Sequence, residues 1–569
     1  MAVLSDLAVG LLPRLLCLSL TLIPVVILLN LLYRFTSTAT LPDHLPWAGL
    51  GGGGGKYSRL KAYLRSLFDM KSLVDEGYTR YSKHGRVYVL PHFLTGPEVV
   101  LPLSQVPWLT EQPESILSQT DVNRQFLEAD YTFLHPNIVR EPVHPDVIKR
   151  ELTHKLSSFA DDIIDELRSC LDDVWGSDTE NWKEVRVYDS MVEIISRLSL
   201  RVFVGMPLCR NREFLHAARM FDKNVVLPAA ILNLLPEFLK PIVAPFVTLY
   251  DRLQYLTCAK YILPEINRRL EQLQIRGGKT EDSLLQDKPD DYIQWAIDHA
   301  LAHWDPVELS ASVISRRFSC ICFAAIQSSV ISITNALFDL ASSPDCAAHL
   351  ATMRAEVLRE TTNVRMTCKA QEINSSYPRG GAEKPSTSTT LGLWDKASLA
   401  RMVHVDSALR ESMRLNGFVV RGIMKTVVAP EGVVLPDGTT RLPQGAKVGI
   451  QAYSVHRDTQ LYGDDAERYR AFRFVPHPSV DSDGGDAAES KTRQPQALVS
   501  TSPTFLAFSY GPNACPGRFF AANQLKMTLA YIALHYEIDP ICERPENKWF
   551  VGSMAPPMWE TLKVRRRRN

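Results

Sequence analysis

A cysteine in a tight turn, immediately before an apolar run, limits how the C-terminal part of this chain is able to fold. The stretch reads PTFLAFSYGPNACPGRFFAANQLKM, and the apolar spacing after Gly517 predicts a helix. The thiol of Cys515 would therefore lie at a helix N-terminus, where the dipole and free N–H groups favour a thiolate. A thiolate there is able to bind a metal ion. Gly511 and Gly517 would let the backbone pass close to a flat ligand, against which Phe508 would pack.

The charge balance and the cysteine spacing exclude several classes of protein. Lys plus Arg and Asp plus Glu each number 63, so no imbalance points to nucleic acid, and the basic residues at the C-terminus are expected to be solvated. The cysteines form no C-x-x-C pair, which argues against a zinc site or a disulfide framework and favours reduced thiols in a cytosolic domain. They lie at positions 17, 170, 209, 258, 320, 322, 346, 368, 515 and 542.

An apolar run over residues 15–33 predicts one membrane helix near the N-terminus. Its sequence, LLCLSLTLIPVVILLNLLY, is long enough to cross a hydrocarbon core of roughly 30 Å. A cleaved secretory signal is the alternative interpretation. Arg14 is the only basic residue before the run, which by the positive-inside rule places residues 1–14 in the lumen and the bulk of the chain in the cytosol. The bases that follow are Arg34, Lys56, Arg59, Lys61 and Arg65.

The remainder predicts a linker and one large catalytic domain. Residues 34–56 are rich in Pro and Gly and indicate a linker, and its glycines match neither a dinucleotide site nor a P-loop. Residues 57–569 are expected to form the domain, interrupted by polar surface loops inserted at 369–392 and 477–496.

The pattern within this domain is mostly helical with short strands. Residues 144–174 and the long apolar run over 306–342 predict helices. Strands are expected in RVYVLP, VVRGIMKTVVAP and AKVGIQAYS, with a turn at PDGTTRLPQG. The expected fold class is therefore mainly α with small β-sheets.

The motif F-x-x-G-x-x-x-C-x-G, formed by Phe508, Gly511, Cys515 and Gly517, resembles the haem-binding signature of the cytochrome P-450 family. The resemblance implies a cytochrome P-450 fold behind the N-terminal membrane helix. It also implies haem b as the cofactor, with Cys515 as its axial iron ligand. A proximal thiolate favours cleavage of the O–O bond of iron-bound oxygen.

A second motif is ALRESMRLNG, in which Glu411 and Arg414 lie three residues apart on a predicted helix. Alone, such a pair is usually a surface ion pair worth roughly 0.3 to 0.5 kcal/mol. In the family the pair is buried and locked to a downstream arginine, and together they help to position the cysteine loop. AERYRAFRFVP supplies that arginine as Arg473.

The third motif, FAAIQSS, lies inside the long apolar helix, and helix packing alone would also explain its small residues. The resemblance assigns Ala325 to the small residue beside the family's oxygen groove and Ser328 to the alcohol of its proton-delivering pair. Gln327 stands where the acid is often found. Because an amide is no acid, water is expected to take a larger part in proton delivery.

The contacts to the haem propionates depart from the family pattern. Asn513 stands where the family commonly has Arg or His, and it brings a hydrogen-bond donor without a charge. The other candidates are Arg421, His144, Lys149 and Arg150.

The resemblance is especially to fungal enzymes of secondary metabolism anchored in the endoplasmic reticulum. It implies insertion of one oxygen atom from O2 into a lipophilic terpenoid, meroterpenoid or polyketide intermediate. Because the chain has no flavin or nicotinamide motif, an NADPH-dependent reductase would supply electrons, docking near Arg518 and Lys526, with cytochrome b5 as a further candidate donor. Phe418, Val419, Val420 and the residues preceding Ala324 would line the substrate pocket.

Two other functions stay open on the sequence alone. A haem-thiolate enzyme that rearranges or dehydrates a peroxide needs no reductase, and Gln327 suits that reaction. A membrane-bound scaffold that binds haem poorly would suit Asn513 and the insertion at 369–392.

Overall fold

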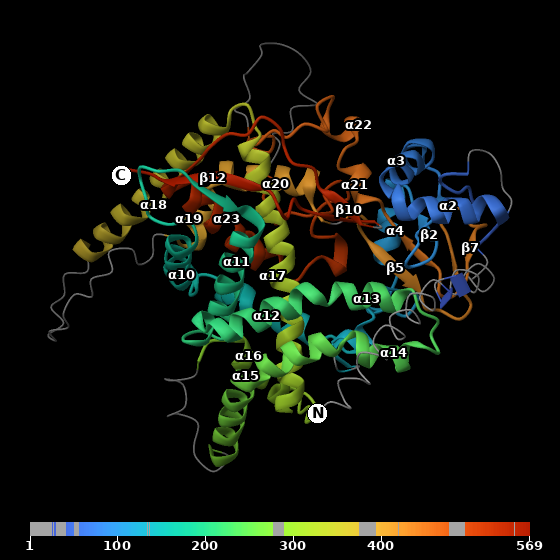
Figure 1. Ribbon diagram of the computed structural model, residues 1–569, viewed down its shortest axis with the longest axis horizontal. Coiled ribbons are helices and arrows are strands. Elements are labelled where there is room, and N and C mark those ends of the chain that lie inside the picture. The colour runs from blue at the N-terminus through green and yellow to red at the C-terminus, as the bar shows by residue number, and fades with distance from the viewer. Residues whose placement is uncertain are drawn as a thin grey trace, which may run out of the picture. The chain divides into compact units, whose positions relative to one another are not determined.

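The computed structural model describes residues 25–26, 28–29, 41–50, 56–133, 135, 137–276, 289–374, 394–418, 420–476, 496–550 and 552–568. The predicted membrane helix over 15–33 lies outside the described residues except at positions 25, 26, 28 and 29, which are helical. Most of the two predicted insertions also lies outside them. The described chain divides into two compact units (Figure 1).

The first unit comprises Met1–Arg140, Asn224–Leu253 and Met424–Ile450. Its main sheet has the strand order β1-β2-β8-β5-β3, and only the β2–β8 pair, in which Val99 lies opposite Val448, is parallel. Three of these strands fall within the three stretches predicted as strands. The seven strands are β1 (Tyr88–Leu90), β2 (Glu98–Val100), β3 (Leu117–Ser118), β5 (Met424–Val427), β6 (Val433–Val434), β7 (Arg441–Leu442) and β8 (Lys447–Gly449).

Helices flank this sheet in sequence, and the predicted turn at PDGTTRLPQG lies between the paired strands β6 and β7. The helices are α2 (Lys56–Phe68), α3 (Met70–Arg80), α4 (Val106–Glu111), α5 (Gln119–Leu127), α6 (Ala129–Thr132), α7 (Asn137–Arg140), α13 (Val226–Asn233) and α14 (Lys240–Val247).

Part of the predicted linker is packed rather than flexible. Trp47 forms a parallel bridge with Val89 of β1, and both side chains are buried. Leu45 and Ala48 are buried as well. The interpretation of 34–56 as a linker is therefore wrong for residues 41–50, because their apolar side chains cover the edge of the sheet.

The second unit comprises Glu141–Lys223, Gln254–Ile423 and Gln451–Asn569, and it is predominantly helical. Two of its helices, α12 and α15, cross the boundary with the first unit. The helices are α8 (His144–Val147), α9 (Thr153–Lys155), α10 (Ala160–Val174), α11 (Val187–Phe203), α12 (Arg212–Asn224), α15 (Leu249–Arg276), α16 (Tyr292–Ala302), α17 (Ala311–Ala341), α18 (Cys346–Asn374), α19 (Lys396–Arg401), α20 (Val403–Asn416), α21 (Ala452–Val455), α22 (Thr459–Tyr462) and α23 (Arg518–His535).

The core of this unit is built around α17, which contacts α11, α20 and α23 (Figure 1). A helix that is apolar on all sides is expected to be buried. Among the described residues α17 is the one helix long and apolar enough to cross a membrane, but 67% of its most apolar stretch is buried inside the protein. The predicted long helix is thus a core helix, and the predicted fold class, mainly α with small β-sheets, is confirmed.

In two segments of this unit the structure differs from the sequence predictions. Helix α18 continues through Asn374, so the first six residues of the predicted loop 369–392 are helical. The basic C-terminal residues are not a solvated tail, because Thr561–Arg566 form β12 in a sheet of order β4-β12-β9. The unit's strands are β4 (Lys183–Arg186), β9 (Tyr536–Ile538), β10 (Lys548–Phe550), β11 (Ser553–Ala555) and β12.

Candidate active site

The loop before α23 holds Cys515 by its own backbone. The N–H of Cys515 donates to the carbonyl of Phe508 at 2.9 Å, which closes the loop. Ser509 and Gly511 have φ angles of 60° and 77°, left-handed conformations that reverse the chain here. Helix α23 begins at Arg518, directly after the cysteine turn, as the apolar spacing predicts.

Opposing effects act on the Cys515 thiol. Burial raises its pKa above the ordinary value, whereas hydrogen bonds from the backbone at Gly517 and Arg518 and the charge of Arg518 lower it. The guanidinium of Arg518 also donates to the Cys515 carbonyl at 3.0 Å and so ties the charge to the loop. A cation at the sulfur would tip this balance towards the thiolate, because a coordinating thiol is deprotonated.

The loop is open on one side. Residues from Asn513 to Phe519 are all half-buried, although α23 is largely buried from Phe520 onward. A Cβ atom built on Gly517 would meet no atom within 4 Å. The backbone at Gly517, two residues after the cysteine, therefore borders free space.

The central helix α17 also has an open face. Ala324 is exposed in the middle of the helix, although Cys322 and Ile326 on either side are buried. Ala325, Gln327 and Ser328 are half-buried, and Ser328, four residues after Ala324, lies on the same helix face as Ala324. The Ser328 hydroxyl donates to the carbonyl of Ala324 at 3.0 Å, one turn earlier in the helix.

Gln327 has a fixed partner on a neighbouring helix. Its side-chain oxygen accepts a hydrogen bond from the hydroxyl of Tyr188 on α11 at 3.3 Å. Burial, followed by the negative charge of Asp189, raises the pKa of Tyr188 to about 12, so this hydroxyl keeps its proton at neutral pH. The contact was not foreseen, because Tyr188 lies far from Gln327 in the sequence.

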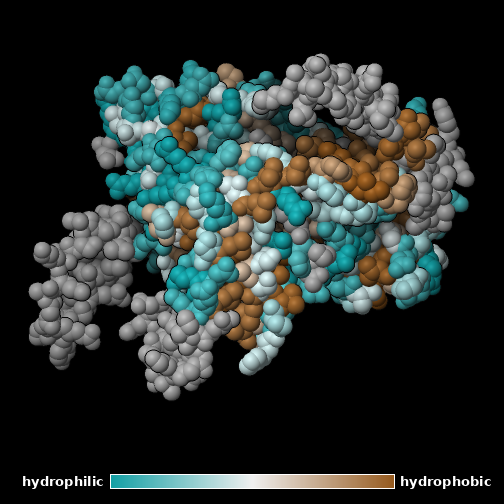
Figure 2. Space-filling model, turned by 60° about the horizontal axis from the view of Figure 1, so that its bottom comes forward, coloured by the Kyte–Doolittle hydropathy of each residue, from teal (hydrophilic) through white to brown (hydrophobic). Residues whose placement is uncertain are grey.

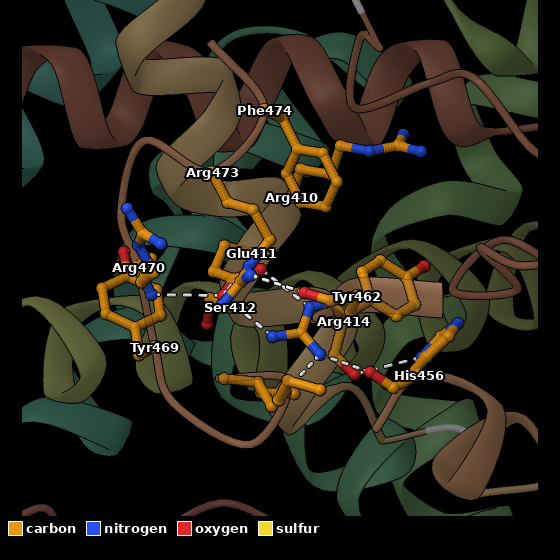
Figure 3. A network of polar contacts seen from close by, with 12 residues as sticks. Arg410, Glu411, Ser412, Arg414, His456, Tyr462, Tyr469, Arg470, Arg473 and Phe474 are labelled. Carbon is orange, nitrogen blue, oxygen red and sulfur yellow. Dashed lines mark hydrogen bonds and ion pairs between the residues drawn. The ribbon is translucent and has the colours of Figure 1, made fainter. Parts of the chain in front are cut away.

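Glu411, Arg414 and Arg473 meet in one buried network (Figure 3). Arg414 donates to both carboxylate oxygens of Glu411, at 2.8 and 2.9 Å, and neither side chain is exposed. Arg473 donates to the same carboxylate at 2.8 Å. Arg473 also donates to Asp465 at 2.8 Å, and hydrogen bonds from Arg473 and Arg470 lower the pKa of Asp465 to about 2.

The network extends to residues that the sequence motifs did not single out. Arg410, beside Glu411 on α20, donates to the carbonyls of Ala497 and Ser500 at 2.6 and 2.9 Å, in the segment that leads to the cysteine loop. His456 bridges Arg414 and Leu506. Their partners are backbone atoms, which leave no signature in a sequence.

The candidates for propionate contacts do not gather in one place. The His144 side chain lies beside Arg317 and Cys320 of α17, and burial, followed by the charge of Arg317, lowers its pKa to about 3. Lys149 and Arg150 are exposed in a π-helical turn over Ile148–Leu152. The remaining two, Asn513 in the turn Gly511–Asn513 and Arg421 between α20 and β5, are half-buried.

Lys526 is not available as a docking residue for a partner. Its side chain is buried on α23, and its ammonium group forms an ion pair with Asp406 of α20 at 2.7 Å. Lys526 therefore does not itself contact a reductase, and docking near Arg518 stays a prediction. Arg518 is half-buried, and its guanidinium lies over the Phe519 ring.

Comparisons with known proteins agree with this geometry. The family model described as Cytochrome P450 matches residues 394–558, which include α20, the buried network and the cysteine loop. Cytochrome P450 monooxygenase htyF of Aspergillus rugulosus is 32% identical over 516 residues, 90% of this chain and 70% of that protein. The chain belongs to the cytochrome P450 family.

Further fungal members of the cytochrome P450 family match over most of their length. Cytochrome P450 monooxygenase gloP of Glarea lozoyensis is 29% identical over 553 residues, 96% of this chain and 95% of that protein. Cytochrome P450 monooxygenase lnaC of Aspergillus flavus is 30% identical over 516 residues, 90% of both chains. The protein is accordingly a haem-thiolate monooxygenase.

The residues of the site fit the haem group that a cytochrome P450 requires. The group needs a thiolate ligand, and the backbone at Gly517 and Arg518 favours the thiolate form of Cys515. Gly517 leaves room beside the loop for a flat group, because a Cβ atom built on it would meet no atom within 4 Å. In the described part of the chain no group of three or more His, Cys, Asp or Glu side chains is placed to hold a metal ion.

Proposed function

We propose that this cytochrome P450 inserts one oxygen atom from O2 into a lipophilic secondary-metabolite intermediate, such as a terpenoid, a meroterpenoid or a polyketide. Electrons would come from NADPH through a separate membrane-bound reductase, with cytochrome b5 as a further candidate donor. The fungal monooxygenases that match the chain support this proposal. When bound, haem supplies the activation of O2 that protein side chains do not provide.

The observation that carries the proposal is the setting of Cys515. The backbone at Gly517 and Arg518 and the charge of Arg518 lower the pKa of its thiol against the effect of burial, and Gly517 borders open space. We propose that Cys515 is the axial ligand of the haem iron, with Phe508, Gly511 and Gly517 shaping the loop around the cofactor. Backbone donors to a thiolate withdraw charge from sulfur and so adjust how strongly it donates to a metal.

On α17, Ser328 would pass protons and Ala325 would leave room for O2. The Ser328 hydroxyl donates to a carbonyl of its own helix, so its lone pairs are free to accept a proton from water before it releases its own. Gln327 holds no acidic proton, and its oxygen is occupied by Tyr188. Water that enters at the exposed Ala324 would therefore supply the protons that Ser328 relays.

The other predicted residues would support the cofactor indirectly. The buried network of Glu411, Arg414 and Arg473 would position the segment that leads to the cysteine loop. Asn513 and Arg421 would contact the propionates as half-buried polar side chains. The contact from Arg421 would compensate for the positive charge that Asn513 lacks.

We also propose that residues 15–33 anchor the protein in the endoplasmic reticulum membrane, with 1–14 in the lumen and a catalytic domain over 57–569 in the cytosol. Exposed apolar side chains on α13 and α14, and on the segment between them, support a membrane location, because a large exposed apolar patch usually marks an interaction surface. Figure 2 shows hydrophobic residues at the molecular surface in brown. These side chains, with their exposed fractions, are Val226 (44%), Leu227 (60%), Phe238 (74%), Ile242 (64%) and Phe246 (77%).

The proposal is tested by reconstituting the protein with an NADPH-dependent reductase, supplying ¹⁸O2 and screening lipophilic intermediates of these three classes. We expect products that carry one labelled oxygen atom per oxidation and that require both NADPH and the reductase. Product formed from a peroxide without NADPH would favour the isomerase or dehydratase alternative, which Gln327 suits. A protein that holds no haem would favour the scaffold.

A further inference from the structure

The imidazole of His456 connects α20 to the segment that leads into the cysteine loop (Figure 3). Its Nε2 atom lies 2.8 Å from the backbone nitrogen of Leu506, and its Nδ1 atom lies 3.0 Å from the carbonyl oxygen of Arg414. Its own carbonyl accepts a hydrogen bond from the Arg414 guanidinium. The residue is 3% exposed, so no water competes for these bonds.

These contacts define the proton positions on the ring. A backbone N–H only donates, so Nε2 must accept from Leu506. A carbonyl oxygen only accepts, so Nδ1 must carry the proton that it donates to Arg414. His456 is therefore neutral with its proton on Nδ1, a state that burial and the nearby charges of Arg414, Arg457 and Arg410 also favour.

The segment held by His456 continues directly to the cysteine. Two residues after Leu506, the carbonyl of Phe508 accepts the backbone N–H of Cys515. Phe505, immediately before Leu506, stacks on the His456 ring with a centroid distance of 5.6 Å and an interplanar angle of 23°. The guanidinium of Arg410 lies 3.7 Å from the centroid of the same Phe505 ring.

We propose that His456 is a positioning residue for the haem ligand. By accepting the Leu506 N–H, His456 holds the segment before Cys515 against α20. This inference rests on the proposed role of Cys515. If the bond to Leu506 is lost, the loop that carries the sulfur loses the attachment to the buried network that lies nearest to the cysteine, although Arg410 still holds the segment at Ala497 and Ser500. A slack loop would bind haem more weakly, or would bind it without thiolate ligation.

Two substitutions separate the two hydrogen bonds of the ring. In His456→Gln the terminal amide reaches the position of Nε2, where its oxygen is able to accept from Leu506, but nothing remains at Nδ1. In His456→Asn the amide lies at the position of Nδ1, where its nitrogen is able to donate to Arg414, but nothing reaches Leu506. Each variant keeps one of the two bonds, so each serves as the control for the other.

The experiment compares full-length wild type and both variants in membranes, by haem content per protein and by the carbon monoxide difference spectrum of the reduced form. Thermal unfolding is followed in parallel. We expect His456→Gln to keep the thiolate band. We expect His456→Asn to lose thiolate-ligated haem by roughly fivefold or more, because a buried N–H without a partner disfavours the native loop.

Equal haem content and equal spectra in the two variants would overturn the inference, since His456 would then only stabilise the core. Greater loss of the thiolate band in His456→Gln would also overturn it, because the bond to Arg414 would then be the one that matters. A wild-type protein without a thiolate band would instead remove the proposed function on which the inference rests. The two failures are therefore distinguishable.

Discussion

At the scale of single residues, Cys515 and Ser328 are both half-buried but are held differently. Cys515 is held by Phe508 through the backbone, whereas the Ser328 hydroxyl bonds to a carbonyl of its own helix. The different constraints suit different tasks, because a metal ligand must stay in place and a proton relay must exchange partners. Substitution of each residue should consequently alter a different property.

Replacing Ser328 by alanine should preserve haem binding but waste reduced cofactor. The methyl group fits the same space, and the hydroxyl bonds only to the Ala324 carbonyl, so the thiolate spectrum should not change. Without the relay, protons arrive late at reduced oxygen and peroxide is released. The peroxide formed per NADPH should rise roughly tenfold or more, since positioned proton transfer contributes about 100-fold to 10,000-fold. Unchanged coupling in Ser328→Ala would refute the proton-relay role.

Asp251 on α15 should make stability depend on pH. Its side chain is 1% exposed, neither carboxyl oxygen has a hydrogen-bond partner among the described residues, and burial raises its pKa to about 7. The folded state thus binds the proton more tightly than the unfolded state, so the free energy of unfolding falls as pH rises from about 4 to about 7.

Asp251→Asn should remove this dependence, because the amide does not ionise. At pH 8 the variant should be more stable than wild type by up to roughly 4 kcal/mol, and near pH 4 the difference should vanish. Denaturant unfolding at both pH values measures it. A wild-type protein whose stability is as high at pH 8 as at pH 5, with no gain in Asp251→Asn, would show that the carboxyl has a partner.

At the scale of elements, α20 carries the part of the site that sequence patterns indicated most directly. The spacing of Glu411 and Arg414 places them on one helix face, and Arg473 follows in a fixed order, so the three residues could be anticipated together. Arg410 and His456 could not, because their partners are backbone carbonyl and N–H groups. Lys526 was misjudged because a charged side chain on a helix is usually exposed, whereas here Asp406 balances its buried charge.

Removing one member of the network on α20 should prevent accumulation of folded holoprotein. Arg414→Ala removes one of the two guanidinium partners of the buried Glu411 carboxylate, leaving Arg473 as the other, and should cost about 3 to 5 kcal/mol of stability. Arg470→Ala is the matched control, because Arg470 is 64% exposed and its pair with Asp465 is worth about 0 to 1 kcal/mol. Its backbone N–H, which donates to Glu411, is unchanged by the substitution.

The comparison is read from haem content and thermal unfolding of the two variants. We expect little holoprotein from Arg414→Ala and near wild-type yield from Arg470→Ala. Similar yields from both would mean that the buried network does not support the fold.

Some strands were predicted from local sequence patterns and others were not. β1, β5 and β8 lie in apolar, β-branched stretches and were predicted. β4 and β12 alternate exposed and buried residues over short spans, and β12 consists largely of basic residues. These two strands form because they pair with each other, with Leu562 opposite Val185. Such a long-range pairing is not visible in the local sequence of either strand.

At the scale of the whole molecule, composition and motifs indicated a mainly helical protein with one thiolate site, and the family and fold are confirmed. The proposed membrane location leads to a separate prediction about vesicle binding. A chain that lacks residues 1–40 should still bind phosphatidylcholine vesicles through α14 and its flanks. Burial of each large apolar side chain contributes about 1.5 to 3 kcal/mol.

Replacing Phe238, Ile242 and Phe246 by serine in the shortened chain should therefore weaken vesicle binding by roughly a hundredfold or more. Sedimentation with vesicles measures the binding, and haem content verifies that the variant is folded. Vesicle binding that is absent in the shortened chain, or unchanged by the serine substitutions, would contradict a membrane-facing role for this surface.

The most direct test of the account is the carbon monoxide difference spectrum of the reduced protein in membranes, recorded for wild type and for Cys515→Ala. The account predicts a Soret band at the red-shifted position of a thiolate ligand in wild type and its complete loss in Cys515→Ala. A thiolate band that persists in Cys515→Ala would mean that another cysteine holds the iron. A wild-type band at the ordinary, histidine-like position, or no band, would contradict the assignment of Cys515 as the haem ligand.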